Sequence, residues 1–245
     1  MPNDLIYGAP EVSTDMFAAI PAAIGDPFLY IETAGRKIAL LGSLDHASVR
    51  AVAADVELLD PRAHGMLELI KAGVRRREAE NRTIVKLLAG LGVDAARVSW
   101  DFPVSVADAL RAAGVALTVD GDPFDARRRV KSPAQLDGIR RAQAAADTAM
   151  GLARDLVHAC PADLTAEAVR AAMRGAAGEL GCDLPDDVIV AVNGQAADGH
   201  ESGHGPITAG DHVLVDIWPR DRASRCWADM TRTFMAGGAT PDAEL

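Results

Sequence analysis

Short apolar runs alternate with amphipathic stretches in the first half of the chain. Runs rich in β-branched and aromatic residues predict strands near 27–31, 37–41, 56–59, 98–100 and 115–119. Helices are expected at 45–54, 66–91 and 104–113, with an interruption near Gly73. This alternation predicts an α/β domain over residues 1–126. No Gly-rich phosphate loop and no cluster of His, Cys or acidic residues is visible there.

The second half begins with a charged segment, 125–133, that is expected to connect two domains. Ser132, Pro133 and Gln135 form a helix start signal with a capping box. Apolar residues then recur every three or four positions from Leu136 to Val157, which predicts a long helix with one buried face.

A second helix is expected from Thr165 to Leu180, followed by a strand at 188–192 and a loop at 193–206. Two further strands, 212–218 and 226–234, are separated by a polar turn. The order helix, helix, strand, loop, strand, turn, strand predicts an α+β domain over residues 127–245, with a mostly antiparallel sheet.

Each of the last two strands carries one aspartate, Asp216 and Asp229, among apolar neighbours. At about 4 Å two carboxylates repel by roughly 1 kcal/mol in water and by about 4 kcal/mol at an effective dielectric constant near 20. One interpretation is that each caps a turn or pairs separately with Arg220, Arg225 or Arg232. The interpretation that we favour is a site for hard divalent cations, which prefer carboxylate oxygens.

The loop contains His200-Glu-Ser-Gly-His204, which matches the H-E-x-x-H zinc motif in residue type and spacing. That motif requires a helix, so that both histidines share one face. A helix is unfavourable here, because the stretch contains Gly199, Gly203 and a Gly-Pro pair at 205–206. We therefore expect no zinc-protease site in this loop.

The run Asp229-Met-Thr-Arg-Thr-Phe234, with Asp216 on the preceding strand, resembles the paired-aspartate hairpin of the pita-bread metallopeptidases. This family includes aminopeptidase P, prolidase and methionine aminopeptidase, and creatinase is a relative that uses no metal. The helix starts at 131–133 and 164–167 also resemble those of aminopeptidase P and prolidase. Residues 1–126 resemble the smaller N-terminal domain of these proteins loosely, and residues 127–245 resemble the N-terminal half of the pita-bread domain.

The resemblance implies a peptidase that hydrolyses N-terminal Xaa-Pro bonds with two divalent metal ions. Asp216 and Asp229 would be metal ligands, with Asp229 as a bridge, and His200 would contact the substrate or the developing oxyanion. Manganese fits carboxylate ligation, and cobalt and zinc are alternatives. The expected partners are a peptide with proline at its second position and, for the full-length protein, a second subunit.

The resemblance also implies three further ligands, a histidine and two glutamates, downstream of the hairpin. The last histidine is His212, and the sequence stops 16 residues after Asp229 (245 − 229 = 16). We therefore expect little or no peptidase activity from the 245 residues alone. A non-catalytic peptide- or protein-binding module and a metal-free creatinase-like hydrolase are the alternatives.

Composition narrows the function further. The net charge of −10 and the aromatic fraction of 4% argue against a nucleic-acid partner. Three cysteines, an odd number at no metal-like spacing, favour a reducing compartment. With neither a leader pattern at the start nor an apolar run of about 20 residues, we expect a cytoplasmic protein without membrane contact.

Overall fold

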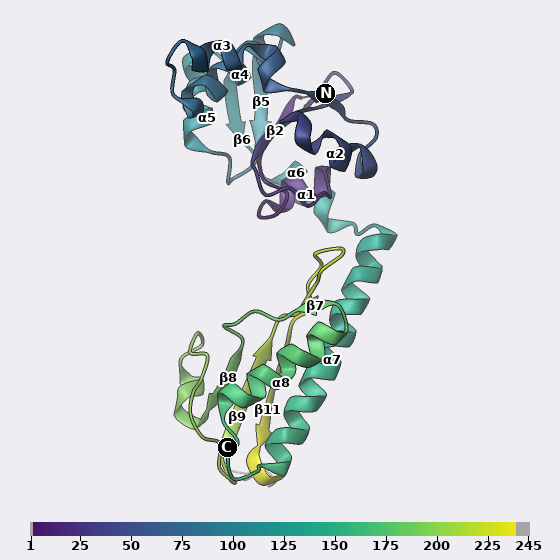
Figure 1. Cartoon of the computed structure of the whole chain (residues 1–245), viewed down its shortest axis with the longest axis vertical. Helices are drawn as coiled ribbons and strands as arrows, with labels where there is room; N and C mark the ends of the chain where they lie inside the picture. The colour runs from purple at the N-terminus through teal and green to yellow at the C-terminus, as the bar shows by residue number, and fades with distance from the viewer. Residues whose placement is uncertain (1, 239–245) are drawn as a thin grey trace. The chain divides into compact units, whose positions relative to one another are not determined.

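The computed structural model describes residues 2–238, and the chain divides into two compact units, Met1–Val130 and Lys131–Leu245 (Figure 1). Each unit has its own hydrophobic core. None of the helices in the described part of the chain combines the length and apolarity needed to cross a bilayer.

The N-terminal unit is built on a mixed sheet with the strand order β4-β3-β2-β1-β5-β6. Strands β1, β2 and β3 pair antiparallel, whereas β4, β5 and β6 join in parallel. The strands are β1 (Asp4–Gly8), β2 (Phe28–Thr33), β3 (Arg36–Leu40), β4 (Glu57–Leu59), β5 (Ala95–Val98) and β6 (Ala116–Val119).

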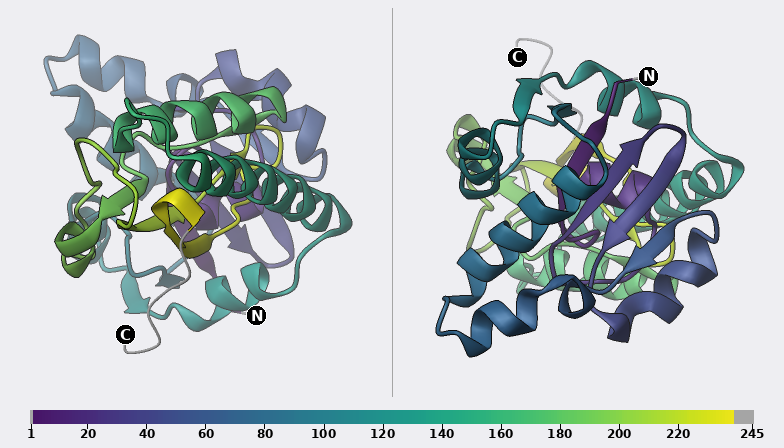
Figure 2. Two further views of the ribbon diagram at one scale, coloured as in Figure 1. Left: turned by 90° about the horizontal axis from the view of Figure 1, so that it is seen from below. Right: turned by 90° about the horizontal axis from the view of Figure 1, so that it is seen from above.

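Helices lie on both faces of this sheet (Figure 2). Alternate strand residues point to opposite faces, so Leu29 and Ile31 meet one helix layer while Phe28 and Tyr30 meet the other. The first layer is α4 (Arg76–Gly90) and α5 (Val104–Ala112), and the second is α1 (Thr14–Ala19), α2 (His46–Val52) and α6 (Asp122–Arg129). The remaining elements are η1 (Ser43–Asp45), η2 (Pro61–His64) and α3 (Met66–Lys71).

The expected α/β architecture is confirmed, with local corrections. Strand β1 and helix α1 were not expected, and β5 occupies 95–98 rather than 98–100. The charged segment expected to connect the two domains is itself helical as far as Arg129, and the two units divide after Val130. Its Arg127 donates to the carboxylates of Asp4 and Glu32, on strands β1 and β2, which holds this helix against the sheet.

The C-terminal unit packs two helices on one face of an antiparallel sheet with the strand order β11-β9-β8 (Figure 1). A second, two-stranded ribbon pairs β10 with β7. The elements are α7 (Pro133–Ala159), α8 (Ala166–Glu179), β7 (Cys182–Asp183), β8 (Ile189–Val192), η3 (Asn193–Ala197), β9 (His212–Ile217), β10 (Arg220–Asp221), β11 (Met230–Met235) and η4 (Ala236–Gly238). The expected α+β fold is therefore confirmed.

Helix α7 follows its sequence signals closely. The capping box between Ser132 and Gln135 is formed, with both reciprocal hydrogen bonds present. The buried face consists largely of alanines, which let α8 and the sheet approach closely: Ala142, Ala145, Ala146, Ala149 and Ala153. Leu136, expected to begin the buried stripe, is instead 42% exposed.

Candidate functional site

The two candidate metal ligands lie on one hairpin, which β9 and β11 form. Asp216 on β9 is directly opposite Thr231 on β11. The same pairing continues beyond the end of β11, where Ala228 is opposite Pro219 and its N–H donates to the Pro219 carbonyl at 3.0 Å. Asp229 therefore lies next to Thr231 on the diagonal from Asp216.

Both aspartates face away from the helices. Val213, Val215 and Ile217 of β9 are buried in the core, so the residues that alternate with them point to the open face of the sheet. Diagonal neighbours in an antiparallel pair are about 7 Å apart. This spacing suits two carboxylates that share a pair of metal ions, which in cocatalytic sites are about 3.5–4 Å apart.

One expectation about these aspartates is wrong. They were expected inside buried strands, but Asp216 is half-buried and Asp229 is exposed. The second strand was expected from Cys226, whereas β11 begins at Met230 and Asp229 precedes it. Because α7 and α8 cover a single face of the sheet, the other face keeps both carboxylates accessible.

The surroundings of the two carboxylates differ. The Thr231 hydroxyl donates to Oδ1 of Asp216 at 2.5 Å. Asp229 forms no hydrogen bond or ion pair with any described residue, and neither aspartate is paired with an arginine within residues 2–238. The neighbouring Arg232 donates to the carbonyl of Thr231 instead.

The chemistry of this pair fits part of a metal site. Two carboxylate oxygens on one open face, one of them oriented by a hydroxyl donor, are suitable ligands for a hard divalent ion. Across residues 2–238, however, no three His, Cys, Asp or Glu side chains gather in a group that could hold a metal. Within the described residues, the two aspartates therefore have no third metal-ligating side chain beside them.

His200 lies in the exposed loop that follows β8, and this loop is held firmly against the sheet. The Ser202 carbonyl accepts from the Val190 N–H at 2.9 Å, and Arg170 of α8 donates to the carbonyls of Ser202 and Gly203. Gly203 has a φ of +77°, and a Cβ there would lie 1.8 Å from the Val190 carbonyl oxygen. Only glycine fits this close approach.

This anchoring brings the loop back along β8. Val190 pairs with Val215, the neighbour of Asp216 in β9, so the anchored part of the loop runs at the level of the candidate ligands. The His200 side chain is exposed and does not join the two aspartates in a metal-sized group.

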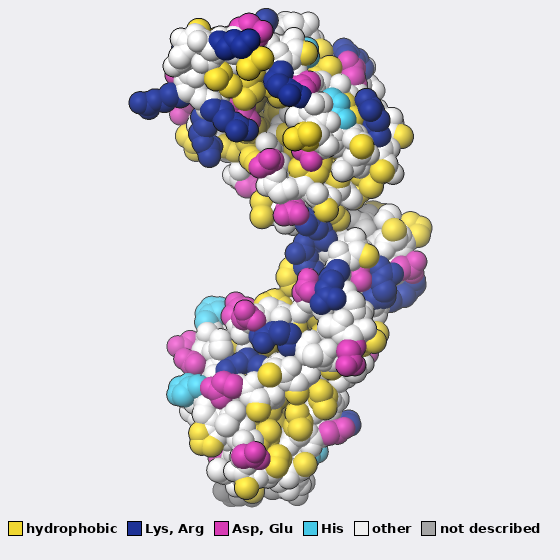
Figure 3. Space-filling view, in the orientation of Figure 1, with side chains coloured by type: hydrophobic (Ala, Val, Ile, Leu, Met, Phe, Trp, Pro, Cys, Tyr) yellow, Lys and Arg dark blue, Asp and Glu magenta, His cyan; other side chains and the backbone are white. Residues whose placement is uncertain are grey.

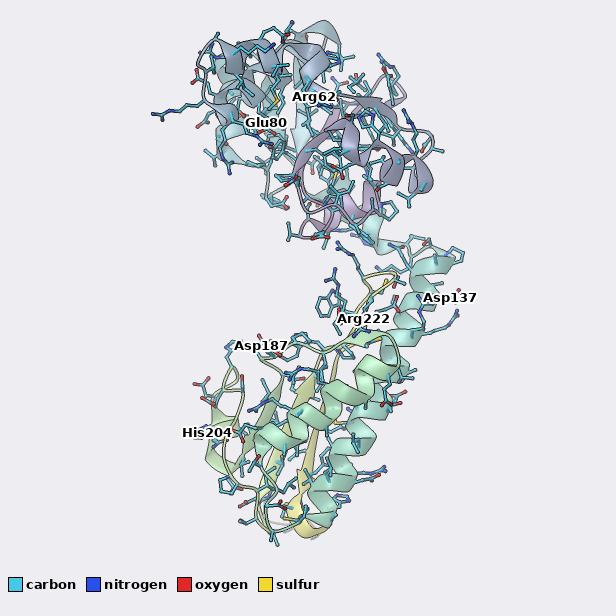
Figure 4. The ribbon with its side chains drawn as sticks, viewed as in Figure 1. Arg62, Glu80, Asp137, Asp187, His204 and Arg222 are labelled. Carbon is cyan, nitrogen blue, oxygen red and sulfur yellow. The ribbon has the colours of Figure 1, made fainter. Side chains whose placement is uncertain are left out.

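The H-E-x-x-H letters do not form a zinc site. Residues 200–204 contain no helix, as expected from the glycines around them. Nδ1 of His204 lies 3.6 Å from a carboxylate oxygen of Glu201, and both side chains are exposed. Figure 4 shows His204 at the outer edge of the C-terminal unit, and Figure 3 shows histidine and acidic side chains on that side of the surface.

Sequence reasoning missed the residue that fixes the loop between the two strands. Asp221 is buried, with its carboxylate gripped by Nε and Nη2 of Arg141 of α7 at 2.9 Å each. Ser224 adds its N–H at 2.7 Å and its hydroxyl at 2.5 Å. Arg141, and then Ser224, hold the pKa of the Asp221 carboxyl well below its usual range. Gly138 permits this contact, because a Cβ there would lie 1.8 Å from Oγ of Ser224.

Asp221 and Arg141 are far apart in the sequence, and no periodic pattern connects them. The available signal was Gly138, since a glycine inside an otherwise strong helix indicates a close approach by another segment.

Comparison with known proteins finds a family match in the C-terminal unit. Residues 137–245 match the model of metallopeptidase family M24. No curated protein matches the chain. The resemblance to the pita-bread metallopeptidases is thus confirmed, and the family match falls on the C-terminal unit.

Solved structures show the same fold over nearly the whole chain. An Xaa-Pro dipeptidase from Bacillus anthracis has a TM-score of 0.74 at 14% identity, over 98% of this chain and 61% of that one. The dipeptidase PepE from Mycobacterium ulcerans has a TM-score of 0.71 at 23% identity, over 98% and 62%. The Asp260Ala aminopeptidase P from Escherichia coli has a TM-score of 0.71 at 16% identity, over 99% and 60%. This chain therefore spans about three fifths of the length of the structures that it matches.

Proposed function

We propose that this chain provides the aspartate ligands of a metal-dependent peptidase that cleaves N-terminal Xaa-Pro bonds. The observation that carries the proposal is the hairpin register, which sets Asp216 and Asp229 on one open face without an arginine partner within residues 2–238. The match to metallopeptidase family M24 and the names of the similar structures, an Xaa-Pro dipeptidase among them, support the choice of reaction.

In this proposal each residue has one task. Asp216 and Asp229 would hold the divalent ions, manganese in preference to cobalt or zinc. The ions would supply Lewis-acid polarisation of the scissile carbonyl. Thr231 keeps Asp216 in its ligating orientation through the 2.5 Å hydrogen bond. His200, on its anchored loop, donates a hydrogen bond to the substrate or to the developing oxyanion.

Two carboxylates would hold a pair of ions weakly, so we expect slow turnover, or none, where no further ligand joins the pair that residues 2–238 supply. We further propose a cytoplasmic protein, in keeping with its three free thiols, and a homodimer for the full-length form. A non-catalytic peptide-binding module is the second candidate. The observation that favours it is the absence of a third metal-ligating side chain near the pair within residues 2–238.

Manganese binding followed by thermal melting tests the proposal. A ligand that binds the native state raises the melting midpoint by mass action. We expect manganese to raise the midpoint of the wild type but not of Asp216→Asn or Asp229→Asn. Asp186→Asn is the matched control, because its carboxylate is exposed and pairs with Arg174. Equal midpoints with and without manganese in all four proteins would favour the binding module.

A further inference from the structure

The N-terminal unit contains a hollow of about 510 Å³ whose charged lining is mainly cationic. The lining comes from three elements that pack together, η2, α3 and α4. Arg62, Arg82 and Lys86 each carry a permanent positive charge, and His64 adds an imidazole. Glu68 is the single carboxylate in the lining, although the whole chain has a net charge of −10. A local excess of positive charge on an acidic protein indicates an anionic ligand.

The ammonium group of Lys86 lies at this hollow without a counter-ion. Gly65 closes η2 with a φ of +97°, and a Cβ there would lie 3.3 Å from Nζ of Lys86. Glycine therefore lets the ammonium group come close to the backbone. Neither Lys86 nor His64 forms a hydrogen bond or an ion pair with any of residues 2–238. Both side chains can therefore donate to a ligand.

Arg62 is held in place but keeps part of its guanidinium free (Figure 4). Its Nε and Nη2 donate to the carboxylate of Asp60, and Nη2 also donates to the hydroxyl of Ser43. Nη1 has no partner within the described part of the chain, so its two N–H groups are available. A cation that is oriented before the ligand arrives lowers the entropic cost of binding.

Arg82 adds a cation that can turn toward a ligand at small cost. It lies four residues before Lys86 on α4, so the two side chains share one face of the helix. Its ion pair with Glu78 joins side chains that are 55% and 52% exposed. Exposed pairs of this kind contribute little to stability.

We propose that this hollow binds the phosphate group of a small organic phosphate. A phosphate monoester carries a charge of roughly −1.5 to −2 at neutral pH and three strong acceptor oxygens. Donors that come from separate elements, Lys86 from α4 and Arg62 and His64 from η2, match a tetrahedral group. A flat carboxylate needs only the fork of a single arginine.

The size of the hollow and its apolar wall favour a phosphate that carries an organic group. The volume lies within the range for small-molecule sites, about 300–1,000 Å³, and exceeds the need of a free phosphate ion. Ala63 and Leu69 supply apolar surface for the organic part. The hollow uses no residue of the proposed metal site, so this inference stands independently of the peptidase function.

Titration calorimetry with adenosine monophosphate on the 245-residue chain tests the site, at about 20 mM salt, where charges are weakly screened. We expect adenosine monophosphate to bind at least about tenfold more tightly than adenosine, and more tightly than inorganic phosphate. Lys86→Met should weaken adenosine monophosphate about tenfold, and Lys86→Arg should keep most of the affinity. Lys71→Met is the matched control and should bind like the wild type, because Lys71 is an exposed lysine of α3 outside the lining.

Equal affinities for adenosine and adenosine monophosphate would overturn the phosphate assignment. Equal affinities for inorganic phosphate and adenosine monophosphate would overturn the organic ligand. Equal losses in Lys86→Met and Lys71→Met would indicate unspecific attraction between charges and would overturn the site itself. A melting curve shows whether each variant is folded, and phosphorus NMR on the wild type gives a second readout. The phosphorus signal of adenosine monophosphate should shift or broaden with protein, and an unchanged signal would also refute the proposal.

Discussion

Replacing Asp221 by asparagine should destabilise the C-terminal unit strongly. The carboxylate is buried, with a side chain 3% exposed, and it receives four donors, two from Arg141 and two from Ser224. Asparagine keeps the size but loses the charge, and its NH₂ group faces donors instead of accepting from them. The guanidinium of Arg141 is then left without its counter-ion.

The structure sets the magnitude at about 3 kcal/mol. Removing one partner of a buried ion pair costs about 3–5 kcal/mol. The Arg141 side chain is 48% exposed, so water recovers part of the loss and the lower end of that range applies. The matched control is Asp183→Asn, because Asp183 pairs with Arg222 at 2.6 Å but both side chains are more than half exposed. Exposed pairs contribute at most about 1 kcal/mol.

Urea unfolding followed by tryptophan emission measures the effect. Trp100 lies in the N-terminal unit and is replaced by phenylalanine in all proteins compared, so the emission comes from Trp218 and Trp227, both in the C-terminal unit. With a denaturant slope of about 1.5–2 kcal/mol per molar, the midpoint should fall by about 1.5–2 M. A fall no larger than that of Asp183→Asn would refute the view that the Asp221 contact anchors this unit.

The pH dependence has a definite sign. The pKa of Asp221 is lower in the folded chain than its value of about 3.9 in the unfolded chain. Its stabilisation is therefore fully present above about pH 5 and is lost as the pH falls through 4 and below. We expect the difference between wild type and Asp221→Asn to be constant from pH 6 to 8 and to shrink progressively below pH 4. A difference that grows in acid would contradict this linkage.

Three further predictions test other parts of the site. Thr231→Val should weaken manganese binding at least tenfold, because Asp216 loses its orienting donor, and calorimetry should show no such loss in Thr233→Val. Gly203→Ala should destabilise the chain by about 2–4 kcal/mol, since φ is positive and the Cβ would overlap the Val190 carbonyl. Gly199→Ala is the control and should melt like the wild type, because a Cβ at position 199 would have no heavy atom within 4 Å. Burial raises the pKa of the Cys182 thiol, so this thiol should not react in the native protein. Ellman's reagent at pH 8 should therefore titrate two thiols in the native wild type and also two in Cys182→Ser. Three reactive thiols in the native wild type would disprove this.

Local sequence patterns predicted many of the helices and strands. The capping box at Ser132 and the apolar spacing after it predicted α7, and the break near Gly73 separates α3 from α4 as expected. Strand β1 was missed, because its five residues begin with Asp4 and carry no clear alternation. That aspartate is satisfied by Arg97 and Arg127, which lie far along the chain, and no local pattern reveals such pairing.

The sequence singled out Asp216 and Asp229 as candidate ligands but did not indicate their environment. The resemblance predicted that the two aspartates lie on one hairpin, and the hairpin register sets them on one face of the sheet. Their burial was overestimated, because the sequence does not show that helices cover one side of this sheet alone. The Asp221 contact with Arg141 was also missed, because it depends on how the turn folds back onto α7, which is a tertiary property.

Manganese soaked into crystals of the chain tests the central claim most directly. Anomalous difference density locates the ion without assumptions about activity. We predict a peak on the open face of the sheet, within about 2.5 Å of carboxylate oxygens from both Asp216 and Asp229, that disappears in Asp216→Asn. No peak at this position, or carboxylates that turn apart to pair with separate arginines, would contradict the account.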